Sequence, residues 1–331
     1  MAGWKTIKPY PGTKLFSALW VALLLILLPA ASGYARPDMQ PLGENIADKG
    51  SSRYHFNVQQ FNSADGQRHY KVWAAIPNQS PPPAGYPVLY MLDGNAVMDR
   101  LSEAFLEQLS AKNPPVIVAV GYQTRLPFDL TARAWDYTPP ESTPEPVKAS
   151  ATRFGRKGGG SAEFRHLLEN VIAPAMEKGI HINPAARGLW GHSFGGLFVI
   201  DTYLTSQFFS YYYSASPSLE RDNFAVLKRL VNLTPGQFCH KQLEYMEGTG
   251  SKAPATDSNA PVNAALVMKQ AEQAINTLRA RGVNASARLY PGLTHGQVFN
   301  ASFHSALLQM AQQPVTTPTT TTCTNSTALA G

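Results

Sequence analysis

The pentapeptide Gly191-His192-Ser193-Phe194-Gly195 places a serine between two glycines at the spacing G-x-S-x-G. This spacing is typical of a nucleophile elbow, a strained turn between a strand and a helix that exposes the serine hydroxyl. The pattern alone is weak, because an ordinary glycine turn also matches it. Its surroundings strengthen it, since an apolar stretch at 187–190 precedes the motif and residues 197–205 have helical spacing. We therefore predict that Ser193 is a catalytic nucleophile.

A serine hydroxyl is a poor nucleophile unless a base accepts its proton. The histidines that follow Ser193 are His240, His295 and His304. His295 comes after a predicted strand at 287–290 in a short loop, and sheets of alternating strands and helices place their sites at such carboxyl strand ends. His240 comes too early, and His304 falls in an expected terminal helix, at the surface. We predict that His295 is the general base, the alternative being a loop or helix-capping histidine, and that His192 points away with a structural role.

Acyl transfer also needs two backbone N–H groups aimed at the oxyanion. The amide of Phe194, the residue after the nucleophile, is the first candidate. The second is expected in the turn that follows the apolar run 88–92, where Gly94 or Asn95 could supply it. Glycine at this turn allows the backbone to approach a substrate closely.

The third member of a catalytic triad, an acid, has no clear candidate. Glu247 ends a predicted strand, and Asp257 lies in a loop of small and polar residues. An acid orients the imidazole and stabilises its cation. A Ser–His dyad without an acid therefore stays open beside both candidates.

The elements around these residues alternate between strand and helix patterns. The uniformly apolar runs 88–92 and 115–120 are typical of parallel strands covered on both faces. A hairpin is expected at 54–61 and 69–76, further strands at 211–216, 243–247 and 287–290, and helices at 96–110, 163–178, 197–205 and 262–281. The sequence thus predicts an α/β-hydrolase fold: a mostly parallel, doubly wound sheet with helices on both faces. A long irregular loop is expected at 121–161.

The two ends of the chain differ from the body in composition. Lysines at 5, 8 and 14 precede an uncharged apolar run at 15–31, which predicts that residues 1–35 are a signal peptide or an uncleaved N-terminal membrane anchor. Residues 36–313 are expected to form one catalytic domain, and the threonine-rich residues 314–331 a poorly ordered tail. We therefore expect a periplasmic protein, soluble or tethered to the inner membrane. Cys239 and Cys323 could pair in that compartment.

The formal net charge of +6 is not concentrated in basic runs, so we expect no nucleic-acid partner. The sequence has no glycine-rich phosphate loop, and we expect no cofactor and no metal. The oligomeric state is left open.

Several blocks in order along the chain resemble the esterase D family. They are 90–95 (Tyr-Met-Leu-Asp-Gly-Asn), 133–139, 159–164, 191–196, 214–218 and 292–296 (Gly-Leu-Thr-His-Gly). Together they extend from about residue 54 to 310 and are far more specific than the elbow alone. Within the family they look like the exported esterases that open the triserine lactone of catecholate siderophores, enterobactin and its glucosylated salmochelin derivatives.

This resemblance implies a serine esterase that acts through an acyl-enzyme. Ser193 and His295 match the family's nucleophile and base, and Arg133 matches a position near the substrate pocket. We expect the Arg133 guanidinium to hold two oxygens of an anionic catecholate; the alternatives are a solvated surface charge and an ion pair with Asp136. The family's acid is missing, because Gly248-Thr249-Gly250 follows Glu247. Two other readings remain: a hydrolase of other carboxylesters or thioesters, and a tethered siderophore-binding protein.

Overall fold

The structure is a computed structural model that describes residues 37–141, 156–250 and 264–313. Internal contacts divide the chain into residues 1–36 and 37–331, and the description below concerns the described residues of the second unit. The expectations for residues 1–35 and for the tail 314–331 therefore lie outside the described residues. Among the described residues, no helix is both long enough and apolar enough to cross a membrane.

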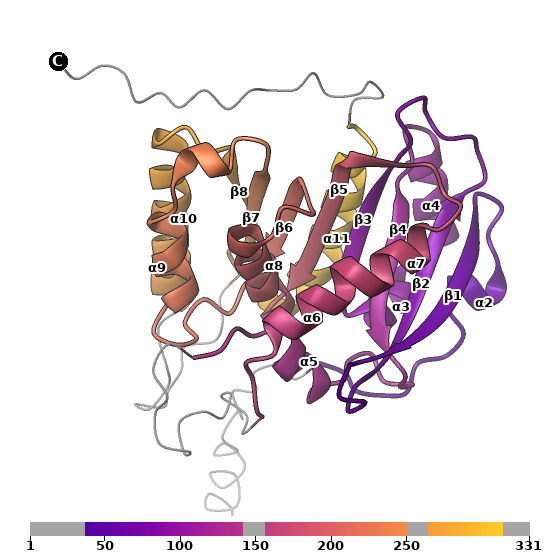
Figure 1. Ribbon diagram of the computed structural model, residues 1–331, viewed down its shortest axis with the longest axis horizontal. Coiled ribbons are helices and arrows are strands. Elements are labelled where there is room, and N and C mark those ends of the chain that lie inside the picture. The colour runs from indigo at the N-terminus through magenta and orange to yellow at the C-terminus, as the bar shows by residue number, and fades with distance from the viewer. Residues whose placement is uncertain (1–36, 142–155, 251–263, 314–331) are drawn as a thin grey trace, which may run out of the picture. The chain divides into compact units, whose positions relative to one another are not determined.

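An eight-stranded sheet runs through the domain in the order β1-β2-β4-β3-β5-β6-β7-β8 (Figure 1). Its strands are β1 (Tyr54–Asn62), β2 (His69–Pro77), β3 (Tyr86–Leu92), β4 (Val116–Tyr122), β5 (Ile182–His192), β6 (Tyr211–Ala215), β7 (Gln242–Gly248) and β8 (Ala285–Tyr290). The predicted hairpin is confirmed, since β1 and β2 pair antiparallel from Tyr54–Pro77 to Asn62–His69. β2 is also antiparallel to β4, and all other neighbours are parallel. The mostly parallel, doubly wound sheet is therefore confirmed.

Helices cover both faces of this sheet (Figure 1). One face carries α6 (Ser161–Leu167), a π-helix (Leu168–Ile172), α7 (Ala173–Glu177), α8 (Phe194–Thr205), α9 (Ala225–Val231) and α10 (Ala264–Ala280). The other carries α2 (Ile46–Lys49), α3 (Gly94–Arg100), α4 (Glu103–Ser110) and α11 (His295–Met310). A short α5 (Ala132–Asp136) and a 3-10 turn (Pro235–Gln237) complete the described helices.

Side-chain alternation along β3 explains why the sheet needs both layers. Val88, Tyr90 and Leu92 pack in the cluster under α6 to α10, whereas Leu89 and Met91 pack in the cluster under α3, α4 and α11. All five side chains are fully buried. Successive residues of a strand point to opposite faces, so a uniformly apolar strand is stable only with a core on each side.

Several sequence predictions differ from the structure in detail. The helix expected at 96–110 is two helices, because Ser102 takes an extended backbone and its hydroxyl accepts from the Phe105 amide as an N-cap. The helix expected at 163–178 contains a π-turn, and the expected loop 121–161 holds α5. Residues 142–155 of that loop lie outside the described part of the chain. Cys239 is disulfide-bonded, and Cys323 lies outside the described residues.

The strand order reverses at β3. From β3 the chain adds β4 on one side and then returns to place β5 on the other. The carboxyl ends of β3 and β5 therefore form a topological switch point, where open α/β sheets bind their ligands. Gly94 follows β3 and Ser193 follows β5, so both belong to this crevice.

Candidate active site

Ser193 forms the sharp turn between β5 and α8. Its backbone has φ 59° and ψ −114°, a region that residues with side chains rarely adopt. A Cβ on Gly191 would lie 2.4 Å from the carbonyl oxygen of Gly195, and one on Gly196 would lie 2.7 Å from that of Ala215. Strand and helix thus approach at distances that only glycine permits. The turn has the geometry of a nucleophile elbow.

The loop after β6 supports this turn from a second side. The Ser193 amide donates to the Ala215 carbonyl at 2.9 Å, and the Ser218 amide donates to the Ser193 carbonyl at 3.2 Å. The Ser218 hydroxyl also lies 3.3 Å from the Ser193 hydroxyl, within hydrogen-bond distance. The end of β6 and the loop that follows it therefore hold the main chain of Ser193, and Ser218 of that loop also contacts its hydroxyl.

His295 is the first residue of α11. Its imidazole centroid lies 4.6 Å from that of His192, the residue before Ser193. The predicted base therefore lies beside His192, the chain neighbour of the predicted nucleophile, although α11 and the elbow are about 100 residues apart in sequence. Their catalytic roles stay predictions on this geometry.

Glycines at the end of β7 and just after it allow the loop of His295 to pass close by. A Cβ on Gly248 would lie 2.2 Å from the carbonyl oxygen of Leu293, and one on Gly250 would lie 2.6 Å from that of Gly292. The Gly250 amide donates to the Leu293 carbonyl at 2.9 Å. Small residues at 248–250, where an acid was expected by resemblance, thus give the histidine loop direct backbone contact with β7.

The prediction that His192 points away from the site is wrong, because its side chain contacts His295. Its side chain crosses to α11, where Nε2 lies 2.8 Å from the main-chain carbonyl oxygen of His295. The residue is buried, at 7% exposure. Burial, followed by the nearby His295, lowers its pKa well below the ordinary value. His192 is therefore a neutral, buried neighbour of the predicted base.

The predicted oxyanion residues begin two helices at the switch point. Phe194 is the first residue of α8, and Gly94 and Asn95 are the first two of α3. Amides in the first turn of a helix have no intrahelical acceptor and are available to an anion. A Cβ on Gly94 would lie 2.7 Å from the β4 backbone, so glycine is required for the turn to dock there. The Asn95 side chain donates to the carbonyls of Tyr122 and Thr124, each at 3.0 Å, and fixes the turn to the end of β4.

Arg133 lies under this turn, but its contacts differ from those expected. Its Nε and Nη2 donate to the two carboxylate oxygens of Asp93, both at 2.8 Å, and Nη2 also lies 3.4 Å from the His192 carbonyl. Asp93 is 1% exposed and Arg133 is 9% exposed. The bidentate contact that we expected Arg133 to make with a substrate is therefore made with Asp93. Asp93 was not among the predicted site residues, although an acid directly after a uniformly apolar strand was a usable signal.

Asp136, the alternative partner of Arg133, belongs to another cluster. Its carboxylate lies 3.0 Å from Arg68 and accepts from the hydroxyls of Tyr70 and Tyr122 at 3.0 and 2.9 Å. Burial raises the pKa of Asp136 to about 7, and these three partners oppose the shift. The alternative of an Arg133–Asp136 ion pair is therefore wrong, because Arg133 pairs with Asp93 and Asp136 pairs with Arg68.

The two acid candidates have different outcomes. The Glu247 carboxylate accepts from the Ser216 hydroxyl at 2.6 Å, from the Tyr245 hydroxyl at 3.1 Å and from the Gly248 amide at 3.0 Å. Ser216 has a positive φ of 38°, so Glu247 braces a strained turn beside the elbow. Asp257 lies outside the described residues.

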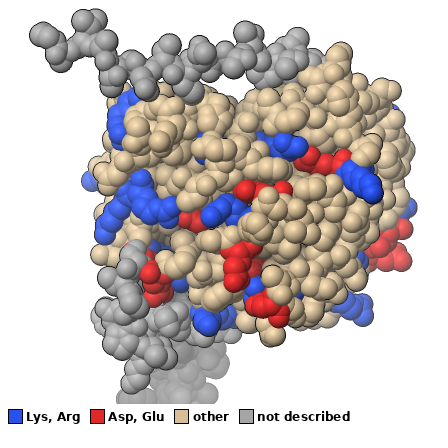
Figure 2. Space-filling model, in the orientation of Figure 1, with Lys and Arg blue, Asp and Glu red and all other residues tan. Residues whose placement is uncertain are grey.

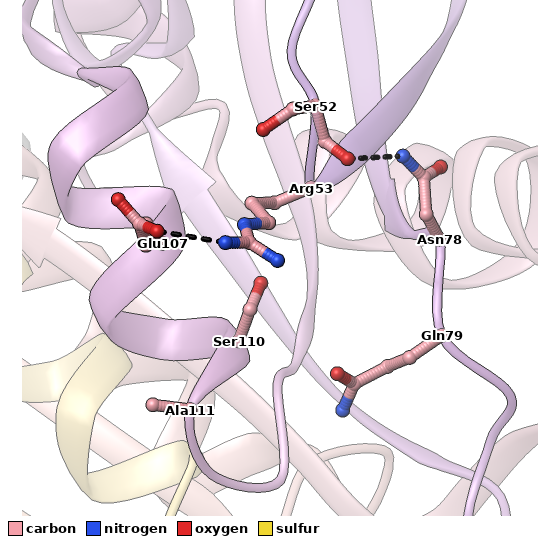
Figure 3. A pocket seen from close by; sticks show the side chains of 7 residues that line it. All are labelled: Ser52, Arg53, Asn78, Gln79, Glu107, Ser110 and Ala111. Atoms are coloured by element: carbon pink, nitrogen blue, oxygen red, sulfur yellow. Dashed lines mark hydrogen bonds and ion pairs between the residues drawn. The ribbon is translucent and has the colours of Figure 1, made fainter.

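One hollow in the surface lies away from this crevice. This polar hollow is lined by Arg53, Asn78, Gln79 and Glu107 (Figure 3). It lies where β1 begins and β2 ends, which is the end of the sheet away from the carboxyl ends of β3 and β5. On the face seen in Figure 2, basic and acidic side chains are interspersed. In the described ranges 37–141, 156–250 and 264–313, no cluster of His, Cys, Asp or Glu could hold a metal ion.

The model of the Esterase family matches residues 63–310, which include the elbow, the switch point and His295. The chain belongs to the Esterase family. This esterase is 52% identical to the apo-salmochelin esterase of Escherichia coli O6:H1 over 305 residues, 92% of this chain and 94% of that one. It is also 34% identical to the ferri-bacillibactin esterase BesA of Bacillus subtilis, over 52% of this chain and 61% of the relative.

Solved structures extend the comparison to three dimensions. The enterobactin and salmochelin hydrolase IroE superposes with a TM-score of 0.70 at 51% identity, covering 81% of this esterase and 99% of IroE. A complex of IroE with DFP gives a TM-score of 0.71 at 51% identity. The family resemblance stated from the sequence is therefore confirmed, as is the α/β-hydrolase fold.

Proposed function

We propose that this esterase hydrolyses the triserine trilactone of catecholate siderophores, enterobactin and its glucosylated salmochelins, through an acyl-enzyme on Ser193. The observation that carries the proposal is the 52% identity to an apo-salmochelin esterase over nearly the full length of both chains. The strained elbow at Ser193, beside an imidazole at the head of α11, supports the same chemistry.

The proposed reaction has two halves. The Ser193 hydroxyl attacks a lactone carbonyl carbon while His295 accepts its proton, and His295 then returns the proton to the departing serine alcohol of the substrate. Water then attacks the acyl-enzyme while His295 accepts one of its protons, and His295 returns that proton to Ser193 Oγ as the carboxylic acid is released. The amides of Phe194 and of Gly94 or Asn95 stabilise the oxyanion formed in each half.

Product analysis tests this substrate assignment. Purified protein is incubated with enterobactin and, separately, with its ferric complex, and the products are separated by chromatography. We expect conversion of the cyclic trilactone to linear serine esters, with a higher kcat/KM than for p-nitrophenyl acetate. Turnover of the simple ester with an untouched trilactone would favour a general carboxylesterase, and trilactone binding without turnover would favour a siderophore-binding protein.

We also propose that the protein acts in the periplasm, either free or tethered to the inner membrane. The proposal rests on the lysines and the apolar run in residues 5–31, which lie outside the described residues. Cell fractionation of the native chain, followed by detection in the periplasmic, membrane and cytoplasmic fractions, tests it. Recovery from the cytoplasmic fraction alone would contradict it.

A further inference from the structure

A direct hydrogen bond joins the strand of the nucleophile to the helix of the base. His192 Nε2 lies 2.8 Å from the carbonyl oxygen of His295. A carbonyl oxygen can only accept, so the His192 proton must be on Nε2 and the imidazole must donate. Because His192 is covalently attached to Ser193, this bond fixes the main chain of His295 relative to the nucleophile.

Because burial lowers the pKa of His192 well below its ordinary value, the imidazole carries one proton, which the carbonyl acceptor places on Nε2. The charged and titratable groups that face it are His295 on α11, Arg133 on α5 and Arg100 on α3. Each of the three disfavours a positive charge on the His192 imidazole, in addition to the loss of hydration on burial. The imidazole also contacts the Phe299 ring at a centroid distance of 5.5 Å, which restricts its orientation.

The main chain around His295 needs such an anchor. The loop at 291–294 is largely exposed, and His295 itself is only half-buried. Backbone contact with Gly248 and Gly250 holds this loop from the side of β7. Within the described residues, the His192 bond holds His295 from the side of β5, next to Ser193.

We propose that His192 is a positioning residue for the general base, acting through its Nε2–H bond to the His295 carbonyl. The inference rests on the proposed catalytic pair of Ser193 and His295. The residue before the nucleophile must therefore supply a hydrogen-bond donor at the position of His192 Nε2. A misplacement of about 1 Å at a catalytic group can cost on the order of 100-fold in rate. Loss of this donor should therefore reduce kcat and leave KM nearly unchanged.

Three substitutions of His192 separate the donor from the ring. His192→Phe keeps an aromatic ring without a donor, and His192→Gln keeps an amide nitrogen near the position of Nε2 without the ring. His192→Asn provides a nitrogen on a shorter side chain, which does not reach the Nε2 position. His181→Phe is the matched control, because His181 is exposed and lies outside the site.

The measurement is kcat and KM with p-nitrophenyl butyrate, on variants whose folding is verified by thermal unfolding. We expect a fall in kcat of about 10- to 100-fold for His192→Phe and His192→Asn, on the order of a misplaced catalytic group. KM should change less than about twofold, since no substrate contact is removed. His192→Gln should retain kcat within about fivefold, as expected if the donor alone matters, and His181→Phe should match the wild type. If His192→Phe fails to fold, the comparison of Asn with Gln takes its place.

A folded His192→Phe or His192→Asn variant with wild-type kcat would overturn the inference, and so would a fall for Gln as large as for Asn. Ser193→Ala and His295→Ala, measured in parallel, separate this result from the function itself. If either alanine variant keeps wild-type activity, the proposed catalytic pair fails. If both are inactive while His192→Phe is unaffected, only the role of His192 fails.

Discussion

Removal of the Arg133 guanidinium by Arg133→Met should destabilise the protein and slow every substrate alike. The substitution leaves Asp93 at 1% exposure, with the two charged donors at 2.8 Å gone. Asp93 precedes Gly94 and Asn95, so the turn that supplies a predicted oxyanion amide loses its support. The effect is therefore expected on the fold and on the chemistry, and not on recognition of the siderophore.

The magnitude follows from the burial of the pair. Breaking a buried ion pair by removing one partner costs about 3–5 kcal/mol, because it leaves an uncompensated charge. At about 2 °C per kcal/mol for a large domain, Tm should fall by roughly 6–10 °C. Loss of one oxyanion donor costs about 100- to 1000-fold in kcat, so a displaced turn should cost about 10- to 100-fold.

Thermal unfolding and kinetics with enterobactin and p-nitrophenyl acetate test this account. Asp93→Asn in the Arg133→Met background should recover part of the stability, because it removes the unpaired charge. A variant with wild-type Tm and wild-type hydrolysis of the small ester, but about a tenfold loss with enterobactin, would contradict a structural role for Arg133. That result would restore Arg133 as a substrate contact.

Two further predictions concern carboxyl groups. Burial raises the pKa of Asp136 to about 7, so the folded state binds this proton more tightly than the unfolded state. Its stabilisation is complete below about pH 4 and is lost as pH rises through 7. Between pH 4 and 8, the free energy of unfolding of the wild type, measured in urea, should fall by up to about 4 kcal/mol relative to that of Asp136→Asn. A difference between the two proteins that is independent of pH would contradict this. Glu247→Gln should lower kcat less than tenfold, against about 10,000-fold for loss of a triad acid, and Asp257→Asn is expected to behave likewise in a dyad; a collapse of kcat in either folded variant would identify the acid.

The sequence was sufficient to predict where the chemistry could lie, because position relative to strand ends is a local property. Ser193 follows an apolar strand and precedes a helix, and His295 follows the last strand, so both could be assigned to one edge of a parallel sheet. The break between α3 and α4 also had a local signal, since Ser102 followed by Glu103 is a typical helix start.

Side-chain partners could not be predicted in the same way. Asp136 is only three residues after Arg133, yet the carboxylate that Arg133 binds is that of Asp93, 40 residues away at the end of β3. His192 was expected to point away, because nothing local indicates that the α11 main chain offers a carbonyl to it. Glu247 resembled a triad acid by position alone, and the Ser216 hydroxyl that it accepts from belongs to another strand end. Such pairings depend on how the sheet brings distant loops together.

Labelling with a fluorophosphonate, followed by intact-mass measurement and peptide mapping, shows whether Ser193 is the nucleophile that His295 activates. The account predicts one phosphonyl group per chain on Ser193, no labelling of Ser193→Ala, and labelling slowed at least about 100-fold in His295→Ala. Enterobactin hydrolysis should be lost in the same variants and in similar proportion. Labelling at another residue, or a Ser193→Ala protein that opens the trilactone at the wild-type rate, would contradict the proposed mechanism.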